Sequence, residues 1–125
     1  MTGFTFDAGA LIAFERGDRR VVKIVARVAE TGGTIAVPAG VVGQVWRDGR
    51  AQARLARLLG SPVVRVEALD DARARAAGQL CGVARTADVV DASVILCARG
   101  HGHAVVTSDP DDLRRLDRSV PLVEL

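Results

Sequence analysis

The chain has 125 residues, 49% of them hydrophobic, and a formal net charge of +2. This length and apolar content suit a single domain spanning residues 1–125. No run of about 18 apolar residues is present, which argues against a membrane-spanning helix. The first residues also lack a secretory pattern, so we expect a cytoplasmic protein.

The basic residues are almost all arginines, since Lys23 is the only lysine. Arginine binds phosphate through two parallel hydrogen bonds, which is compatible with a nucleic-acid partner, although GC-rich coding gives the same bias. Aromatic residues amount to 3% and include no tyrosine. A stacking platform for single-stranded RNA is therefore excluded, and contacts with RNA would go mainly to its backbone.

Short β-rich runs alternate with helical patterns along the chain. The first half predicts a strand at 4–6, helices over 7–15 and 18–30, a strand at 34–37, a helix that begins with Pro38 and ends near Trp46, and a helix over 50–59. The second half predicts a strand at 63–66, a helix over 70–83, a nearly all-apolar helix over 88–99, a strand at 104–107, a helix over 109–117 and a strand at 122–123. This alternation predicts an α/β fold with a mostly parallel sheet covered by helices on both faces.

Three aspartates stand out because ligands of such folds bind beyond the carboxyl ends of the strands. Asp7 follows the first strand, Asp109 follows the fourth, and Asp91 lies in the first turn of the apolar helix. Clustered carboxylates repel one another unless a divalent cation neutralises them, and oxygen ligands suit Mg²⁺ or Mn²⁺. Such an ion activates water for hydrolysis of a phosphodiester.

A simpler interpretation is that these aspartates only cap helices, because aspartate is a preferred N-cap. Capping is the favoured role for Asp88, and a solvated first turn is the favoured environment for Asp111 and Asp112. Asp91 argues against the simpler interpretation, since a charge inside an apolar helix needs a partner.

Three segments, 6–11, 89–95 and 105–113, resemble in order and spacing the motifs of PIN domains, and the whole chain resembles VapC-type toxins. The resemblance implies a five-stranded parallel sheet, an acidic pocket for Mg²⁺ or Mn²⁺, and endoribonuclease activity on RNA. It also implies a homodimer and a cognate antitoxin. Asp7, Asp91 and Asp109 match the family's acidic residues, and Thr107 matches a hydroxyl residue beside them. Supporting candidates in the closing motif are Ser108 and Asp111.

One position departs from the family pattern. Where the family places a glutamate on the helix after the second strand, this chain has Gln44. An amide oxygen can accept a hydrogen bond from metal-bound water but brings no charge. Asp88 or Asp48 could compensate. Arg47 and Arg50 flank the end of this helix and are candidate phosphate contacts, with a solvated face as the alternative.

Gln44 keeps a second hypothesis open, a PIN-like module that binds RNA or an antitoxin but barely cleaves. A phosphoacceptor receiver domain would need a lysine at a strand end, whereas Lys23 lies within a helix. A haloacid-dehalogenase-like phosphatase would need an aspartate where Gly9 stands, and an NTPase would need a GxxxxGK loop, which is absent.

The histidines and cysteines suggest no site of their own. His101 and His103 lie in a glycine-rich turn with no cysteine near them in the predicted fold, so metal binding is not expected there. Cys81 and Cys97 fall in apolar helical stretches and are expected to be buried, reduced thiols.

Overall fold

The computed structural model describes residues 3–125 and contains one five-stranded sheet in which every neighbouring pair of strands is parallel. The strand order is β3-β2-β1-β4-β5. The strands are β1 (Gly3–Phe6), β2 (Thr34–Pro38), β3 (Val64–Glu67), β4 (Ala104–Thr107) and β5 (Leu122–Glu124). The α/β class is confirmed, and the sheet is entirely rather than mostly parallel.

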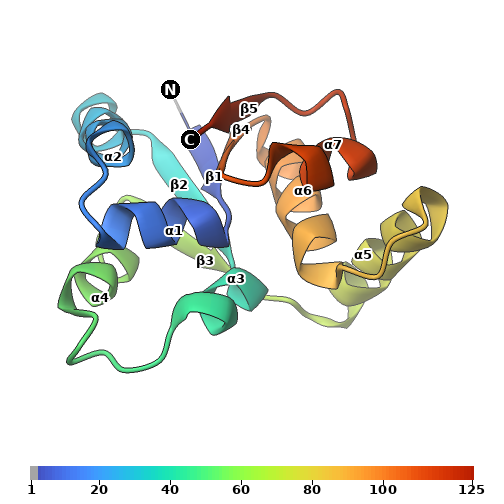
Figure 1. Ribbon diagram of the computed structural model, residues 1–125, viewed down its shortest axis with the longest axis horizontal. Helices are drawn as coiled ribbons and strands as arrows, with labels where there is room; N and C mark the ends of the chain where they lie inside the picture. Colours follow the sequence, from blue (N-terminus) through green and yellow to red (C-terminus); the bar gives the residue numbers. More distant parts are fainter. Residues whose placement is uncertain (1–2) are drawn as a thin grey trace.

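Helices cover both faces of the sheet, as predicted. They are α1 (Ala8–Glu15), α2 (Arg19–Thr31), α3 (Ala39–Val45), α4 (Ala53–Leu59), α5 (Asp71–Ala84), α6 (Val89–His101) and α7 (Pro110–Leu116). Figure 1 shows α1, α2 and α4 on one side of the strands and α5, α6 and α7 on the other. Helix α3 lies at the carboxyl end of β2 and contacts both α1 and α6, so it joins the two layers. In the described part of the chain, no helix has the length and apolarity that a membrane span requires.

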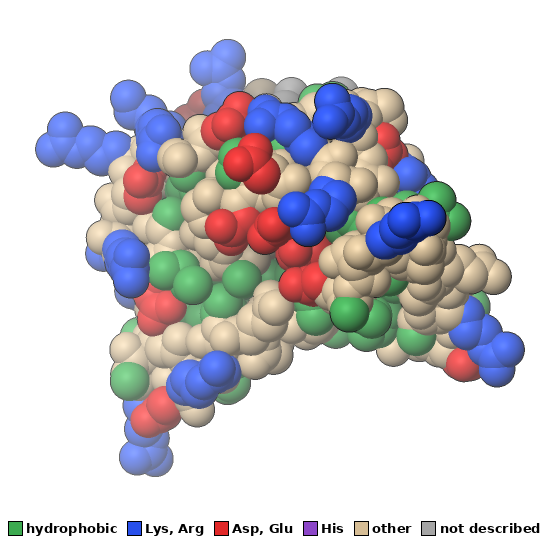
Figure 2. Space-filling view, turned by 45° about the vertical axis from the view of Figure 1, so that its right-hand side comes forward, with side chains coloured by type: hydrophobic (Ala, Val, Ile, Leu, Met, Phe, Trp, Pro, Cys, Tyr) green, Lys and Arg blue, Asp and Glu red, His purple; other side chains and the backbone are tan. Residues whose placement is uncertain are grey.

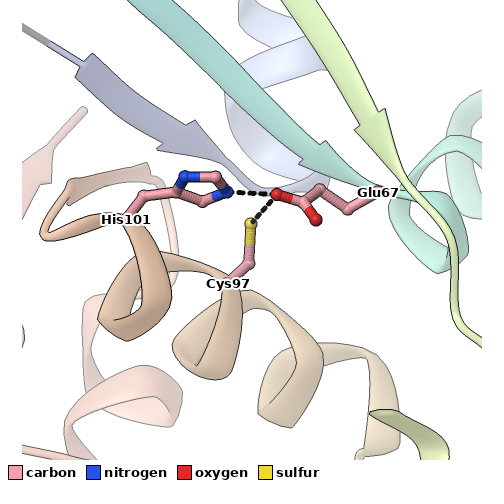
Figure 3. A group of neighbouring side chains, drawn as sticks. All are labelled: Glu67, Cys97 and His101. Atoms are coloured by element: carbon pink, nitrogen blue, oxygen red, sulfur yellow. Dashed lines mark hydrogen bonds and ion pairs between the residues drawn. The ribbon is translucent and has the colours of Figure 1, made fainter. Parts of the chain in front are cut away.

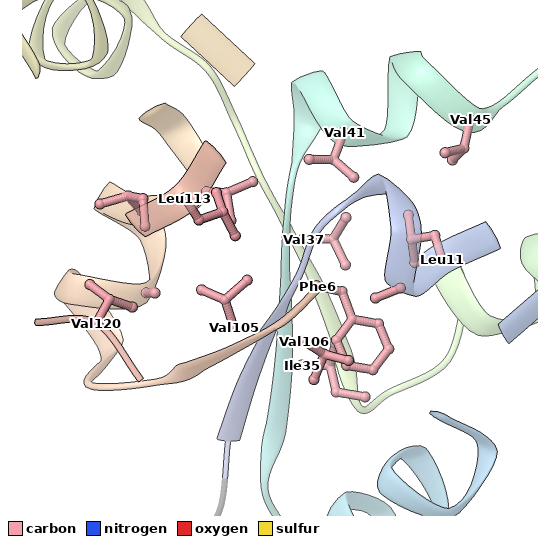
Figure 4. Close-up of a cluster of buried hydrophobic side chains, with 14 of the residues drawn as sticks. Phe6, Leu11, Ile35, Val37, Val41, Val45, Val105, Val106, Leu113 and Val120 are labelled. Carbon is pink, nitrogen blue, oxygen red and sulfur yellow. The ribbon is translucent and has the colours of Figure 1, made fainter. Parts of the chain in front are cut away.

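The core lies on both faces of the sheet because successive strand residues point in opposite directions. In β4, Val105 faces the layer that contains Leu113, while Val106 faces the layer of Phe6 and Leu11 (Figure 4). All five side chains are at least 99% buried. Strands buried on both faces read as continuous apolar runs, which is why the central strands could be located in the sequence.

Helix starts and ends follow the predicted signals. The carboxylates of Asp18 and Asp70 accept hydrogen bonds from backbone N–H groups in the first turns of α2 and α5. Gly32 and Gly102 end α2 and α6 with φ values of 70° and 67°, a left-handed conformation that glycine adopts without steric cost.

Several predicted boundaries shift by one or two residues, and the apolar helix extends through His101, which was predicted to lie in a turn. Two further differences have a clear local cause. The helix expected over 50–59 begins only at Ala53, because the side chain of Gln52 accepts hydrogen bonds from the N–H groups of Arg47 (2.7 Å) and Asp48 (3.0 Å) and holds the chain in a turn. Pro38 is the last residue of β2 and caps α3 instead of opening it.

Candidate active site

A cavity of about 340 Å³ opens at the carboxyl edge of the sheet, between the start of α1, the end of α3 and the starts of α6 and α7. The backbone N–H of Asp7 donates to the carbonyl of Val106, which holds the end of β1 beside β4. Figure 2 shows acidic side chains gathered across the middle of one face, with Lys and Arg side chains around them. Five carboxylates line the cavity: Asp7, Asp88, Asp91, Asp109 and Asp112.

Asp7 is the most deeply buried of these acids, with 5% of its surface exposed. Its carboxylate caps α1 by accepting the backbone N–H of Ala10 at 3.0 Å. Burial raises the pKa of Asp7, and the negative charge of Asp109 adds to this, while the Thr107 hydroxyl and the Ala10 N–H partly oppose it. Asp7 therefore has a capping role and also faces the other acids.

Asp91 carries the largest perturbation of the five. Burial, followed by the negative charges of Asp88, Asp112 and Asp7, raises the pKa of Asp91 to about 7. The predicted cap is also present, since the Asp88 carboxylate accepts the backbone N–H of Asp91 at 2.9 Å. A pKa raised this far means that the surroundings of Asp91 disfavour the negative charge of its carboxylate.

Asp109 occupies the N-cap position of α7, but its side chain makes no capping hydrogen bond. Its backbone N–H donates to the hydroxyl of Thr107 at 2.8 Å, and Thr107 is fully buried. The loop between β4 and α7 passes so close to α1 that a Cβ at Gly9 would collide with the Ser108 hydroxyl. The Asp109 carboxylate is thus placed at the cavity without being used as a cap.

In the part of the chain that the structure describes, no basic side chain forms an ion pair with these carboxylates. Arg47 also lines the cavity, but its guanidinium donates to the carbonyls of Gly43 (3.2 Å) and Trp46 (2.7 Å) at the end of α3. The cavity therefore holds a concentration of negative charge that none of the described ion pairs compensates.

The structure brings most of the sequence-selected residues together. Asp7, Asp91 and Asp109 line the same cavity, and so do Gln44 and Asp88. Thr107 lies beside the cavity because its hydroxyl accepts the backbone N–H of Asp109, and Ser108 lies beside it because it packs closely against Gly9. Gln44 is solvent-exposed and presents an amide where a family glutamate was expected.

Other selected residues lie outside the cavity. The Asp111 side chain is 99% exposed and pairs with Arg114 at 3.7 Å. Asp48 and Arg50 are not among the lining residues, and the Asp48 carboxylate instead accepts the backbone N–H of Arg50 at 3.0 Å.

Asp112 was expected to lie in a solvated first turn, and it is solvent-exposed but also lines the cavity. It lines the cavity in place of Asp111 because it lies three residues after Asp109, and positions three apart share one face at a helix start. The three-residue spacing from Asp109 is the sequence signal that could have pointed to Asp112 rather than Asp111.

A second group of side chains also differs from expectation. Cys97 is half-buried, and it lies with His101 beside Glu67, although no cysteine was predicted near the histidines. Both cysteines are free thiols, as predicted. This group lines a different cavity, which shares no lining residue with the acidic cavity.

Comparison with known proteins identifies the family of this chain and solved structures with a similar fold. A family model described as the PIN domain matches residues 4–119. Among solved structures, VapBC2 from Rickettsia felis, bound to a DNA fragment from its promoter, contains a chain with a TM-score of 0.73 at 12% identity, covering 99% of both chains. FitAcB from Neisseria gonorrhoeae gives a TM-score of 0.65 at 18% identity, covering 97% of this chain and 96% of the other.

A third structure, the sarcin–ricin loop cleaving toxin VapC20 from Mycobacterium tuberculosis, gives a TM-score of 0.60 at 23% identity, covering 82% of this chain and 86% of that one. A search of curated proteins finds no significant match. At these identities the structural likeness shows the fold alone, but the family model covers nearly the whole sequence. The chain therefore belongs to the PIN-domain family.

Proposed function

We propose that this protein is a metal-dependent endoribonuclease, the toxin of a toxin–antitoxin pair, which hydrolyses RNA phosphodiester bonds with Mg²⁺ or Mn²⁺. The observation that carries the proposal is that five aspartates line one cavity with no basic partner among the described ion pairs. Such an arrangement is unfavourable in the protein alone, and a divalent cation would relieve it.

The donor set fits a hard cation. All five acids offer oxygen, which Mg²⁺ and Mn²⁺ prefer over the nitrogen and sulfur ligands of zinc. Within residues 3–125, three ligand atoms lie within 4.8 Å of one another only at Glu67, Cys97 and His101, so the acidic carboxylates are spread more widely. Mg²⁺ commonly uses one or two carboxylates and keeps several waters, and this wider spacing suits that mode of binding.

The residues at the cavity would have different roles. Asp7, Asp91 and Asp109 would hold the ion, one or two of them directly and the others through its water ligands, and Asp88 and Asp112 would add negative charge around it. When bound, such an ion activates a water molecule and stabilises the charge that develops at phosphorus. The Gln44 amide oxygen would accept a hydrogen bond from water in the cavity, and the Thr107 hydroxyl would hold the loop that carries Asp109.

Arg47 is the proposed RNA contact at this site, because it is the basic residue that lines the cavity. An arginine beside the acids can bind a phosphate of the RNA backbone and offset the repulsion between RNA and the carboxylates. Arg50 lies outside the cavity and has no such role in this proposal.

The antitoxin assignment rests on the neighbours and the homodimer on the family resemblance, and both belong to the proposal. The similar structures include toxin–antitoxin complexes from Rickettsia felis and Klebsiella pneumoniae. We therefore propose that a cognate antitoxin blocks the cavity and that two copies of the chain form a dimer. Co-expression with a candidate antitoxin, followed by light scattering of the free and bound chain, tests both assignments.

The deciding experiment is RNA cleavage by the purified, partner-free protein with Mg²⁺, with Mn²⁺ and with EDTA. Cleavage should require the metal and should fall on the order of 100-fold or more in Asp91→Asn, since loss of a metal ligand removes the charge that holds the ion. Asp111→Asn is the matched control, because this exposed acid lies two residues from Asp109 but outside the cavity. Equal loss in both variants would contradict the assignment of Asp91.

The neutral amide at Gln44 favours one alternative, a module that binds RNA or an antitoxin without cutting efficiently. Failure of the folded protein to cleave any RNA with either metal, together with retained RNA or antitoxin binding, would support this alternative.

A further inference from the structure

We propose that Glu67, Cys97 and His101 form a zinc-binding site that is separate from the acidic cavity. One ligand atom from each residue lies within 4.8 Å of the other two, and the described part of the chain contains no other such group of histidine, cysteine and acidic side chains. Figure 3 shows the three side chains converging from the end of β3 and from two successive turns of α6.

The helix supplies two of the ligands through its own periodicity. Cys97 and His101 are four residues apart on α6 and therefore lie on the same face, one turn above the other. The edge strand β3 ends at Glu67 opposite this face. A bound ion would thus connect an edge strand to the central helix of one layer.

The carboxylate of Glu67 is already oriented for such a role. One oxygen, Oε2, pairs with Nη1 of Arg73 at 2.8 Å. The other oxygen, Oε1, lies 3.9 Å from Sγ of Cys97 and contacts Nε2 of His101. Arg73 thus fixes one oxygen from outside and leaves the other directed at the two remaining ligands, an arrangement that is common around metal ligands.

The ligand types select zinc over the hard cations of the acidic cavity. Thiolate and imidazole are ligands that Zn²⁺ favours and Mg²⁺ does not, and a carboxylate can complete the set. Burial raises the pKa of the Cys97 thiol to about 11, so the ion must displace a proton that passes to solvent.

The surroundings leave room for a fourth ligand. Three protein ligands leave one of the four tetrahedral positions for water or another group. The three residues line a cavity of about 350 Å³ whose other walls include the apolar side chains of Leu69 and Leu96. The open position would face this cavity and would be accessible to a small ligand.

The test uses Co²⁺ as the probe, added to reduced, chelator-treated full-length protein. Wild type should show a thiolate-to-cobalt charge-transfer band at one equivalent, and Zn²⁺ should abolish it by displacement. Ions held by the aspartates cannot produce this band, because those ligands are all oxygen. Asp91→Asn should keep the band, which separates this proposal from the proposed nuclease.

Matched variants identify the ligands. Cys97→Ser should lose the band, whereas Cys81→Ser, which removes the only other thiol, should keep it. His101→Gln should weaken Co²⁺ binding at least about tenfold, and His103→Gln should weaken it less. The His101 side chain is 38% exposed, so this variant should fold even if Cys97→Ser does not. Zn²⁺ should also raise the melting temperature of wild type but not of His101→Gln.

Two results would overturn the proposal. One is the absence of a charge-transfer band in reduced wild type whose fold is verified by circular dichroism. The other is a band that persists unchanged in Cys97→Ser. In either case the three side chains would form only the hydrogen-bonded pair of Glu67 and His101 with a thiol beside it.

Discussion

Helices α5 and α6 begin with the same local chemistry in different surroundings. Asp70 and Asp88 cap them, each accepting a hydrogen bond of 2.9 Å from the backbone N–H three residues on. In the first turn of α5, Asp71 is exposed and pairs with Arg75 at 3.1 Å. In the first turn of α6, Asp91 lies among other carboxylates, and its pKa is raised to about 7.

The difference comes from where each helix starts relative to the sheet. Helix α6 begins at the carboxyl edge beside the ends of β1 and β4, where the strand order brings other acids together. Helix α5 begins after the edge strand β3, where solvent and an arginine are available. The start of α5 therefore has a structural role only, whereas the start of α6 combines a structural role with the proposed role in metal binding.

The largest expected effect comes from changing aspartate to asparagine at two helix caps, one that lines the cavity and one that does not. Asparagine caps a helix about as well as aspartate, so Asp7→Asn and Asp70→Asn should both keep their helices. Asp7→Asn should lower metal-dependent RNA cleavage about 100-fold or more, because it removes a carboxylate from the cavity. Asp70→Asn should cleave like wild type. Circular dichroism and cleavage rates would measure this, and full activity of a folded Asp7→Asn would contradict the ligand role.

The second prediction concerns the charge in the cavity. Gln44→Glu should bind Mn²⁺ about tenfold more tightly, since affinity for such ions rises with the number of charged ligands. Gln79→Glu adds the same charge on the exposed surface of α5 and serves as the control. Calorimetric titration of both variants would measure the change. Equal affinities would show that Gln44 does not face the ion.

The third prediction is a pH dependence of stability without divalent ions. The folded pKa of Asp91, about 7, is above its ordinary value of 3.8, so the folded state binds the proton more tightly than the unfolded state. The resulting stability is fully present below about pH 4 and is lost as the pH rises to about 7. Thermal unfolding should show this loss in wild type and in Asp71→Asn, and a smaller loss in Asp91→Asn. Parallel curves for wild type and Asp91→Asn would contradict the raised pKa.

The smallest expected effect compares two arginines near the end of α3. Arg47→Ala should lower RNA cleavage about threefold, as for the loss of one solvent-exposed charge contact, because Arg47 lines the cavity. Arg50→Ala, outside the cavity, should leave cleavage unchanged. Rates at several salt concentrations would measure both effects. A greater loss in Arg50→Ala would place the RNA path elsewhere.

Much of the architecture could be predicted because it rests on local signals. Apolar runs such as that of β4, capping aspartates such as Asp18 and Asp70, and the glycine at 32 each act over a few residues. The start of α4 could not be predicted in this way. It depends on the side chain of Gln52 satisfying backbone N–H groups five and four residues earlier, which no periodicity records.

Patterns a few residues long were enough to predict the order of strands and helices, the parallel sheet and the aspartates that follow β1 and β4. Which acids face one another depends instead on how distant segments of the chain pack together. Asp112 and Asp111 are neighbours with the same side chain, and the orientation of α7 turns one to the cavity and the other to solvent. The approach of Cys97 and His101 to Glu67 likewise joins residues 30 and 34 positions apart, which packing of α6 against the sheet brings together and no local pattern encodes.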